Sequence, residues 1–206
     1  MRPLQQRFIL IFFGWVWLTA CAGGTAVLFH YNLTPGTAGK APAQWPAAGP
    51  LALFPGTDTL VMAVHPRCPC TRASLMELNE LMLSLQGRLK AYVLVVKPAG
   101  VPQGWEDTDI LSSAKRVPGV IVKIDPEGLE ASRLGAETSG QAILFDPQGR
   151  LLFNGGITES RGHVGDNEGL RRIIAWVKTG TADKNGSLVF GCSLQSKTCP
   201  REKAGL

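Results

Sequence analysis

The apolar residues of this 206-residue chain fall into two patterns. From Phe8 to Tyr31 no Asp, Glu, Lys or Arg interrupts an apolar run. A membrane-spanning helix needs about 20 apolar residues, so this run is long enough to cross a bilayer. Beyond residue 56, short apolar runs alternate with segments in which apolar residues recur at helical spacing. That alternation predicts a folded domain built from both strands and helices.

Nine elements are predicted in the alternating region. Five strand-like runs cover residues 59–64, 89–96, 120–124, 142–146 and 150–154. Of the four helical patterns, the first ends near Gly87, the second covers 105–116, the third covers 127–134 and the last ends at Gly180. Early strands that alternate with helices imply parallel crossovers, whereas Pro147-Gln148-Gly149 predicts a late antiparallel hairpin. The predicted fold class is α/β, with a central mixed sheet and flanking helices, preceded by an N-terminal transmembrane helix.

Composition sets the expected domain boundaries. Residues 32–56 are rich in Pro, Gly and Ala and contain no acidic residue, which is typical of a semi-extended linker. We therefore expect a cytoplasmic N-terminus (1–7), a transmembrane anchor (8–31), the linker (32–56), the folded domain (57–180) and a C-terminal tail (181–206).

Charge predicts how the apolar run is oriented. Arg2 and Arg7 precede it, and Lys40 is the only basic residue among the 25 that follow it. The positive-inside rule then leaves the N-terminus in the cytoplasm. We expect a single-pass protein of the inner membrane with its domain on the periplasmic, outer side. A cleaved signal peptide competes with this interpretation. Leu18-Thr19-Ala20-Cys21 resembles a lipobox, so a lipoprotein anchored at Cys21 is a further alternative.

The rest of the charge argues against nucleic-acid binding. Without Arg2 and Arg7, 19 Lys and Arg are set against 16 Asp and Glu, and no long basic block is present. A nucleic-acid-binding domain would concentrate positive charge on one face or helix. We expect no nucleic-acid partner, despite a formal net charge of +5.

The candidate chemistry lies between the first strand and the first helix of the domain. His65-Pro66-Arg67-Cys68-Pro69-Cys70-Thr71-Arg72 carries two cysteines one residue apart. Cys70 is expected at the helix N-terminus, where unpaired N–H groups and the helix dipole favour an anion. Arg67 and Arg72 add positive charge, so we predict a lowered thiol pKa. Cys68, expected to be the more exposed of the two thiols, is the candidate nucleophile and Cys70 the resolving thiol, with the reverse assignment open.

This motif is compatible with several kinds of function. A disulfide between Cys68 and Cys70 would close a small ring around Pro69, and strained disulfides are more oxidising. Thiol-disulfide exchange is the leading hypothesis, with no cofactor and with protein thiols or disulfides outside the membrane as partners. The first alternative is a Cu(I) carrier with Cys68, Cys70 and His65 as ligands. A thiol peroxidase and a non-catalytic interaction domain are further alternatives.

The element order, with paired cysteines where the first strand meets the first helix, resembles the thioredoxin-like superfamily over residues 55–180. The layout is similar to that of membrane-anchored, extracytoplasmic thiol-disulfide proteins. The runs 65–77, 155–158 and 161–163 resemble the RedB-type branch more narrowly. The family motif is Cys-x-x-Cys, however, and the family has a cis-proline where this chain reads Thr138-Ser139-Gly140. Because that proline shapes the family's substrate groove, its absence puts ordinary dithiol exchange in doubt.

The resemblance and the hairpin together indicate further site residues. Thr138 and Ser139, with Arg67 and Arg161, are expected to bind substrate. The loop 155–167 follows the hairpin and should return to the edge of the sheet near Cys68. In that loop His163 is a candidate general base and Arg161 a candidate anion-binding group. Asp166 or Asn167 is expected to cap the last helix.

Two more cysteines, Cys192 and Cys199, enclose six residues near the C-terminus. An extracytoplasmic location permits disulfides, so a structural Cys192–Cys199 bond is the first expectation. The alternative is a relay pair that exchanges with Cys68–Cys70.

Overall fold

The computed structural model describes residues 3–197 and divides the chain into two compact units, one up to Thr34 and one from Pro35 onward. The first unit is a single helix, α1 (Pro3–Leu33), with exposed apolar side chains. Its stretch Gln5–Leu33 is long and apolar enough to cross a membrane. Within it the Thr19 hydroxyl donates to the carbonyls of Trp15 and Val16. This polar group is therefore satisfied inside the helix, as an apolar environment requires.

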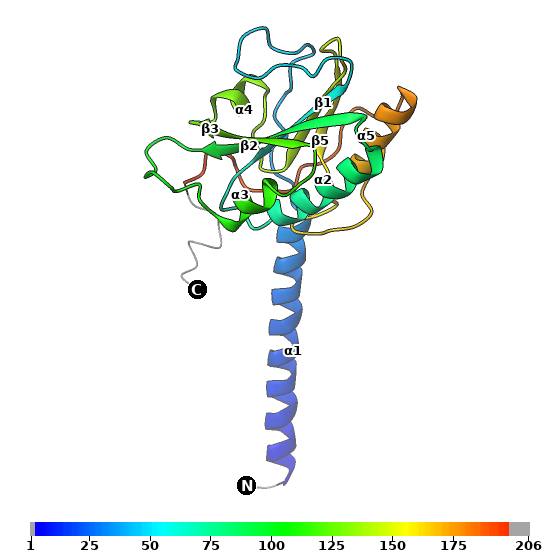
Figure 1. The fold of residues 1–206 in the computed structure, drawn as a ribbon. Helices are drawn as coiled ribbons and strands as arrows, with labels where there is room; N and C mark the ends of the chain where they lie inside the picture. Colours follow the sequence, from blue (N-terminus) through cyan, green and yellow to red (C-terminus); the bar gives the residue numbers. More distant parts are fainter. Residues whose placement is uncertain (1–2, 198–206) are drawn as a thin grey trace. The chain divides into compact units, whose positions relative to one another are not determined.

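The second unit is built around a five-stranded sheet with the order β3-β2-β1-β4-β5 (Figure 1). The strands are β1 (Asp58–Val64), β2 (Leu89–Lys97), β3 (Val120–Pro126), β4 (Gln141–Phe145) and β5 (Leu151–Gly156). The helices are α2 (Thr71–Leu85), α3 (Asp109–Ala114), α4 (Leu129–Arg133) and α5 (Glu168–Thr179). Strands β1, β2 and β3 are parallel, whereas β4 is antiparallel to both β1 and β5. The element order, the mixed sheet and the final hairpin are as the sequence predicts.

Alternating side chains of the sheet form two apolar clusters. In β1, Leu60 and Met62 point to the side covered by α2, α3 and α5, while Val61 and Ala63 point to the opposite side. This is the two-residue period of a strand buried on both faces. The first face carries the larger cluster and extends to the N-terminal end of α2.

Residues from Pro35 to Gly56 are part of this unit, which differs from the expected linker. The backbone N–H of Trp45 donates to the carbonyl of Gly149 at 2.7 Å, and its ring packs edge-to-face on Phe145 at 5.1 Å. The physical reason is that α4, only five residues long, leaves most of the second sheet face uncovered. Apolar side chains of residues 45–54 cover it instead.

The expected tail also differs, because residues 183–196 pack along the domain. The Asn154 N–H of β5 donates to the Asn185 carbonyl at 2.8 Å. The buried Arg172 guanidinium of α5 binds the Asp183 carboxylate and the Gly186 carbonyl. The segment therefore leaves α5, returns beside β5 and continues toward the N-terminal end of α2.

Candidate functional site

The Cys68-Pro69-Cys70 segment forms a tight turn between β1 and α2. The Cys68 N–H donates to the His65 carbonyl, and the Thr71 N–H donates to the Cys68 carbonyl, both at 3.1 Å. Pro69, the single residue between the cysteines, has no N–H, and these two hydrogen bonds of the turn are donated by Cys68 and Thr71 instead. Cys70 is the N-cap residue of α2, as predicted, and its side chain makes no capping hydrogen bond.

Three cysteines, not two, meet at this turn. Cys68, Cys70 and Cys192 form a buried cluster with exposed fractions of 0%, 5% and 7%. Cys192 comes from the C-terminal segment, more than 120 residues away along the chain. The sequence-based order of accessibility is therefore wrong, because Cys68 is not the more exposed thiol.

The expectation of a lowered pKa is wrong for Cys70. A hydrogen bond that joins its thiol to Cys68 raises the pKa of Cys70, and burial raises it further. The nearby sulfur atoms of Cys68 and Cys192 act in the same direction, while Arg161 opposes them. Cys70 therefore retains its proton in the reduced pair. The arrangement suits Cys68 as the attacking sulfur and Cys70 as the thiol that reacts second.

His65 is buried and held as a neutral ring. Its Nδ1 accepts from the Arg67 N–H at 3.1 Å, so its other nitrogen, Nε2, carries the proton. That Nε2 donates to the Ser196 carbonyl at 2.7 Å. The ring also meets Trp105 edge-to-face. Because both nitrogens are engaged, His65 offers no lone pair to a metal in this conformation, contrary to the alternative ligand set.

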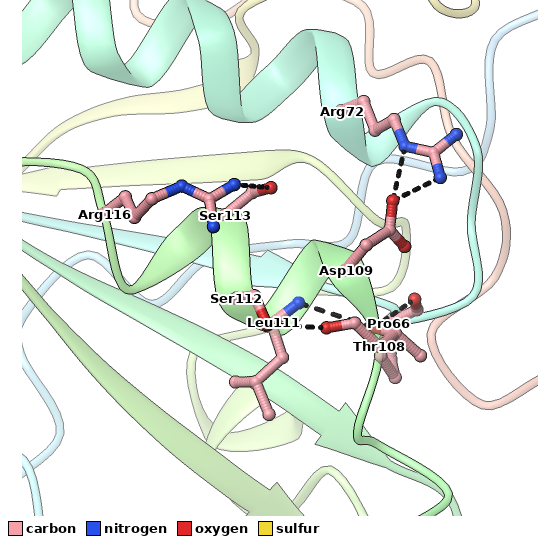
Figure 2. Close-up of polar contacts among 8 residues, drawn as sticks. All are labelled: Pro66, Arg72, Thr108, Asp109, Leu111, Ser112, Ser113 and Arg116. Atoms are coloured by element: carbon pink, nitrogen blue, oxygen red, sulfur yellow. Dashed lines mark hydrogen bonds and ion pairs between the residues drawn. The ribbon is translucent and has the colours of Figure 1, made fainter.

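Both arginines of the motif contact α3 or the turn that precedes it. Figure 2 shows the Arg72 guanidinium forked on the Asp109 carboxylate of α3, with both side chains exposed. Arg67 stacks over the Trp105 ring at 4.9 Å and donates from Nε to its carbonyl at 3.3 Å. The Arg72 charge is thus balanced by a carboxylate and reaches Cys70 weakly, in contrast to the prediction.

Helix α3 is fixed to the cysteine turn. The Thr108 hydroxyl donates to the Pro66 carbonyl at 3.0 Å and also caps the helix by accepting from the Leu111 N–H (Figure 2). The predicted helix start at residue 105 is too early, because Trp105 lies in the preceding turn and packs on His65. The α3 N-terminus therefore supports the motif.

Thr138 and Ser139, expected to bind substrate, bind the chain itself. The Ser139 hydroxyl accepts from the His65 N–H and contacts the Thr71 hydroxyl, both at 2.8 Å. The Thr138 hydroxyl donates to the Thr37 carbonyl at 2.8 Å. Both side chains are buried. Their hydroxyl groups thus hold the strand-to-helix junction and residue 37 in place.

The backbone beside these residues pairs with the C-terminal segment. The Ser139 N–H donates to the Cys192 carbonyl at 2.8 Å, and the Leu194 N–H donates to the Glu137 carbonyl at 2.9 Å. An antiparallel bridge joins Thr138 to Ser193. The predicted partner of Cys192, Cys199, lies outside the described residues, so a bond between them stays a prediction.

The loop after β5 approaches the site through one of its two candidate residues. Arg161 donates from Nη1 to the Gly191 carbonyl at 2.7 Å and acts electrostatically on Cys70. His163 is exposed on the same loop, so its role as a base stays a prediction.

A buried carboxylate that sequence analysis missed holds this loop. Glu77 of α2 accepts from the Gly165 N–H at 2.6 Å and from the Asn167 side-chain amide at 3.2 Å. Asn167 also caps α5 by accepting from the Leu170 N–H at 2.8 Å, which confirms that prediction. The only local signal for Glu77 is its place on the apolar side of α2, where an acidic residue needs a partner.

Comparisons with known proteins bear on the fold. No protein-family model and no curated protein matches the chain. A hypothetical protein from Sinorhizobium meliloti 1021 is 21% identical, with a TM-score of 0.56 over 79% of this chain and 94% of that one. An uncharacterized conserved protein from Geobacillus kaustophilus is 18% identical, with a TM-score of 0.57 over 81% and 94%.

A named thioredoxin is matched over a smaller part of the chain. The exposed lipoprotein thioredoxin Etrx1 from Streptococcus pneumoniae strain TIGR4 is 16% identical, with a TM-score of 0.42 over 60% of this chain and 84% of that one. The narrower likeness to the RedB-type branch stays a prediction. The observed strand order has a parallel β1–β2 pair with a crossover helix, followed by an antiparallel hairpin beside β1. The chain has the thioredoxin-like fold.

Proposed function

We propose that this chain is a membrane-tethered, extracytoplasmic thiol-disulfide oxidoreductase whose redox pair is Cys68 and Cys70. The observation that carries the proposal is the packing of Cys68 against Cys70 inside a buried cluster of three cysteines, at the strand-to-helix junction of a thioredoxin-like fold. Inert structural cysteines need no such mutual contact. Two cysteines that pack together and lie two residues apart in the chain are close enough to form a disulfide after a small side-chain rotation.

The exchange reaction follows from the different environments of the two thiols. The Cys68 thiolate attacks one sulfur of a partner disulfide; a Cys68–partner bond forms, and the other partner sulfur leaves with the electron pair. Cys70 then loses its proton to that leaving thiolate and attacks Cys68. The Cys68–Cys70 disulfide forms as the second partner thiol is released. Two electrons pass from the pair to the partner, and the reverse sequence oxidises a partner dithiol.

The membrane part of the proposal rests on α1. The helix is continuous through Cys21 and extends to Leu33, which favours an uncleaved anchor over a lipoprotein processed at Cys21. The basic residues Arg2 and Arg7 favour a cytoplasmic N-terminus, which supports a domain on the periplasmic side. In that compartment disulfides persist, and protein thiols or disulfides are the available partners.

Copper carriage is the weaker alternative. His65 has both ring nitrogens engaged, and the raised pKa of Cys70 opposes a second thiolate. Within residues 3–197 no group of three or more His, Cys, Asp and Glu side chains is arranged to hold a metal ion. Cu(I) binding is therefore tested as a competing outcome.

The test uses the full chain in detergent and measures reduction of a model protein disulfide. We expect Cys68→Ala to lower the rate to that of the uncatalysed reaction, because the thiolate is the nucleophile. Cys21→Ser removes a thiol outside the cluster and should leave the rate unchanged, which makes it the matched control. Thermal melting checks that the buried substitution preserves the fold. Full activity of Cys68→Ala contradicts the proposal, as does tight stoichiometric Cu(I) binding by a wild type inert toward disulfides.

A further inference from the structure

We propose that Cys192 is a third exchange thiol of this site, which forms a disulfide with Cys68 and relays it between Cys70 and the C-terminal segment. The proposal deepens the proposed function and rests on it for one point: oxidation of Cys68 and Cys70 by an outside partner supplies the disulfide. The packing of residues 189–196 on the domain is its structural basis.

The C-terminal segment adds a short antiparallel strand beside residues 137–139. Successive side chains of an extended segment point to opposite sides. Cys192 and Leu194 are accordingly buried, while Ser193 and Gln195 are exposed. The register therefore directs the Cys192 thiol toward Cys68 and Cys70, and a shift by one residue would direct it to solvent.

Contacts on both sides of Cys192 hold this register. Toward the N-terminus, the Gly36 N–H donates to the Val189 carbonyl at 2.8 Å and Arg161 donates to the Gly191 carbonyl. Toward the C-terminus, Nε2 of His65 donates to the Ser196 carbonyl at 2.7 Å. Two residues of the cysteine site, His65 and Arg161, thus hold the segment that carries the third cysteine.

Close backbone packing brings the segment against Ser139. This residue lies in the stretch 138–140, where the thioredoxin-like family has the proline that shapes its substrate groove. A Cβ atom on Gly191 would lie 2.0 Å from the Ser139 carbonyl oxygen, so only glycine permits this approach. With the segment in place Cys68 has no exposed surface, so an outside disulfide reaches it only when residues 189–196 move aside. Exchange inside the cluster is therefore the reaction that this closed arrangement permits.

The exchange step conserves electrons within the chain. The Cys192 thiolate attacks the Cys68 sulfur of the Cys68–Cys70 disulfide. A Cys68–Cys192 bond forms as the Cys68–Cys70 bond breaks, and Cys70 leaves with the electron pair. Cys70 then takes up the proton that Cys192 released, so one disulfide and one thiol are present before and after the step. The reverse step carries a disulfide from Cys192 back to the pair.

The decisive experiment leaves only one intramolecular choice for Cys68. The full chain carrying Cys21→Ser, Cys70→Ser and Cys199→Ser is equilibrated in detergent with glutathione redox buffers and mapped by mass spectrometry without reduction. We expect a Cys68–Cys192 disulfide with an effective thiol concentration of about 1 mM or more. The matched control adds Cys192→Ser and Ser193→Cys, which moves the thiol to the exposed side. There the disulfide should be at least about tenfold less favoured, because the register directs it away.

Absence of the Cys68–Cys192 disulfide from folded protein overturns the proposal, and so does an equally stable link from position 193. Circular dichroism and thermal melting establish that each variant is folded. If the variant is unfolded, the wild type mapped after partial oxidation takes its place, and a Cys68–Cys192 fraction must be found there.

The two proposals fail in distinguishable ways. A Cys68–Cys192 disulfide in a chain that never exchanges with an outside disulfide supports this inference and contradicts the proposed function. If Cys192→Ser exchanges with outside disulfides at the wild-type rate and no Cys68–Cys192 link is detected in the wild type, the proposed function is supported and this inference is contradicted.

Discussion

Helices α2 and α5 both begin beside functional loops, but their N-termini are built differently. At α5, Asn167 has an extended backbone, its side chain accepts from the Leu170 N–H, and Glu168 adds an acidic group to the first turn. At α2, Cys70 has a helical backbone (φ −67°, ψ −24°), makes no side-chain cap and is followed by no acidic residue in the first turn. The N-terminus of α5 is therefore capped by a side-chain hydrogen bond, whereas the N-terminus of α2 has a cysteine at its N-cap and no such bond.

This difference teaches which effect controls a thiol at a helix N-terminus. A helix dipole stabilises an exposed anion by about 0.3–1 kcal/mol, which is less than one pKa unit. Burial shifts the pKa of a fully enclosed group by up to several units. At Cys70, burial and the contact with Cys68 act upward together, so the uncapped helix end does not lower the pKa. Position at a helix N-terminus therefore does not by itself identify a reactive thiolate.

Replacing the N-cap residue of α2, Cys70, by serine should lower exchange activity without raising the free energy of unfolding. In a Cys192→Ser background, where no third thiol can resolve the mixed disulfide, we expect Cys70→Ser to lower turnover with a protein disulfide by about 100-fold or more, because it removes a resolving thiol held at high effective concentration. The helical backbone of residue 70 keeps the new hydroxyl from the N–H groups of the first turn. Steady-state exchange and urea unfolding measure the two effects. Retained turnover, or a gain in unfolding free energy, contradicts the comparison.

Removing the N-cap of α5 should lower stability and leave exchange activity nearly unchanged. Asn167→Ala should lower the free energy of unfolding by about 1–2 kcal/mol, because the Leu170 N–H loses its acceptor. Exchange activity should change by less than about twofold, since the α2 end is unaltered. Asn167→Ser is the matched control: it keeps a capping oxygen but loses the amide that binds Glu77. Equal stability of Asn167→Ala and wild type in urea titrations argues against the cap.

The smallest effect concerns alkaline pH. The folded pKa of Cys70 lies above the unfolded value, so folded protein binds more protons once the unfolded thiol ionises. The associated stability is complete below about pH 8.5, the free thiol value, and is lost as pH rises above it. We expect the reduced wild type to lose up to about 1.4 kcal/mol per pH unit there, relative to Cys70→Ser. Parallel urea-derived stability curves between pH 8 and 10 would show that Cys70 is not shifted upward.

Local patterns in the sequence predicted the parts of the fold that depend on near neighbours. Strand and helix order followed from apolar periodicity, and the cap at Asn167 followed from residue type and position. Trp45 and Cys192 were not placed, because their partners lie about 100 or more residues away in the sequence. A Pro-, Gly- and Ala-rich composition favoured a linker for residues 32–56 and concealed the apolar side chains that cover the sheet.

The candidate site shows the same division. The sequence placed Cys70 at the start of a helix, because the strand and the apolar stripe on either side set that boundary. It did not show that Arg72 binds Asp109, since the charge of an exposed arginine can be directed to any nearby carboxylate. Nor did it reveal Ser139 as a link between His65 and Thr71, which requires residues 65–71 to meet a segment about 70 residues away in the chain.

The contact of Gly191 with Ser139 has a consequence for how this chain varies during evolution. Glycine is required at position 191 only while the segment lies against the Ser139 carbonyl. The exchange role that we propose for Cys192 requires a cysteine at position 192 only under the same condition. The two positions should therefore be inherited as a unit. A lineage that loses the thiol at 192 releases the constraint at 191, and side chains other than glycine should then accumulate there.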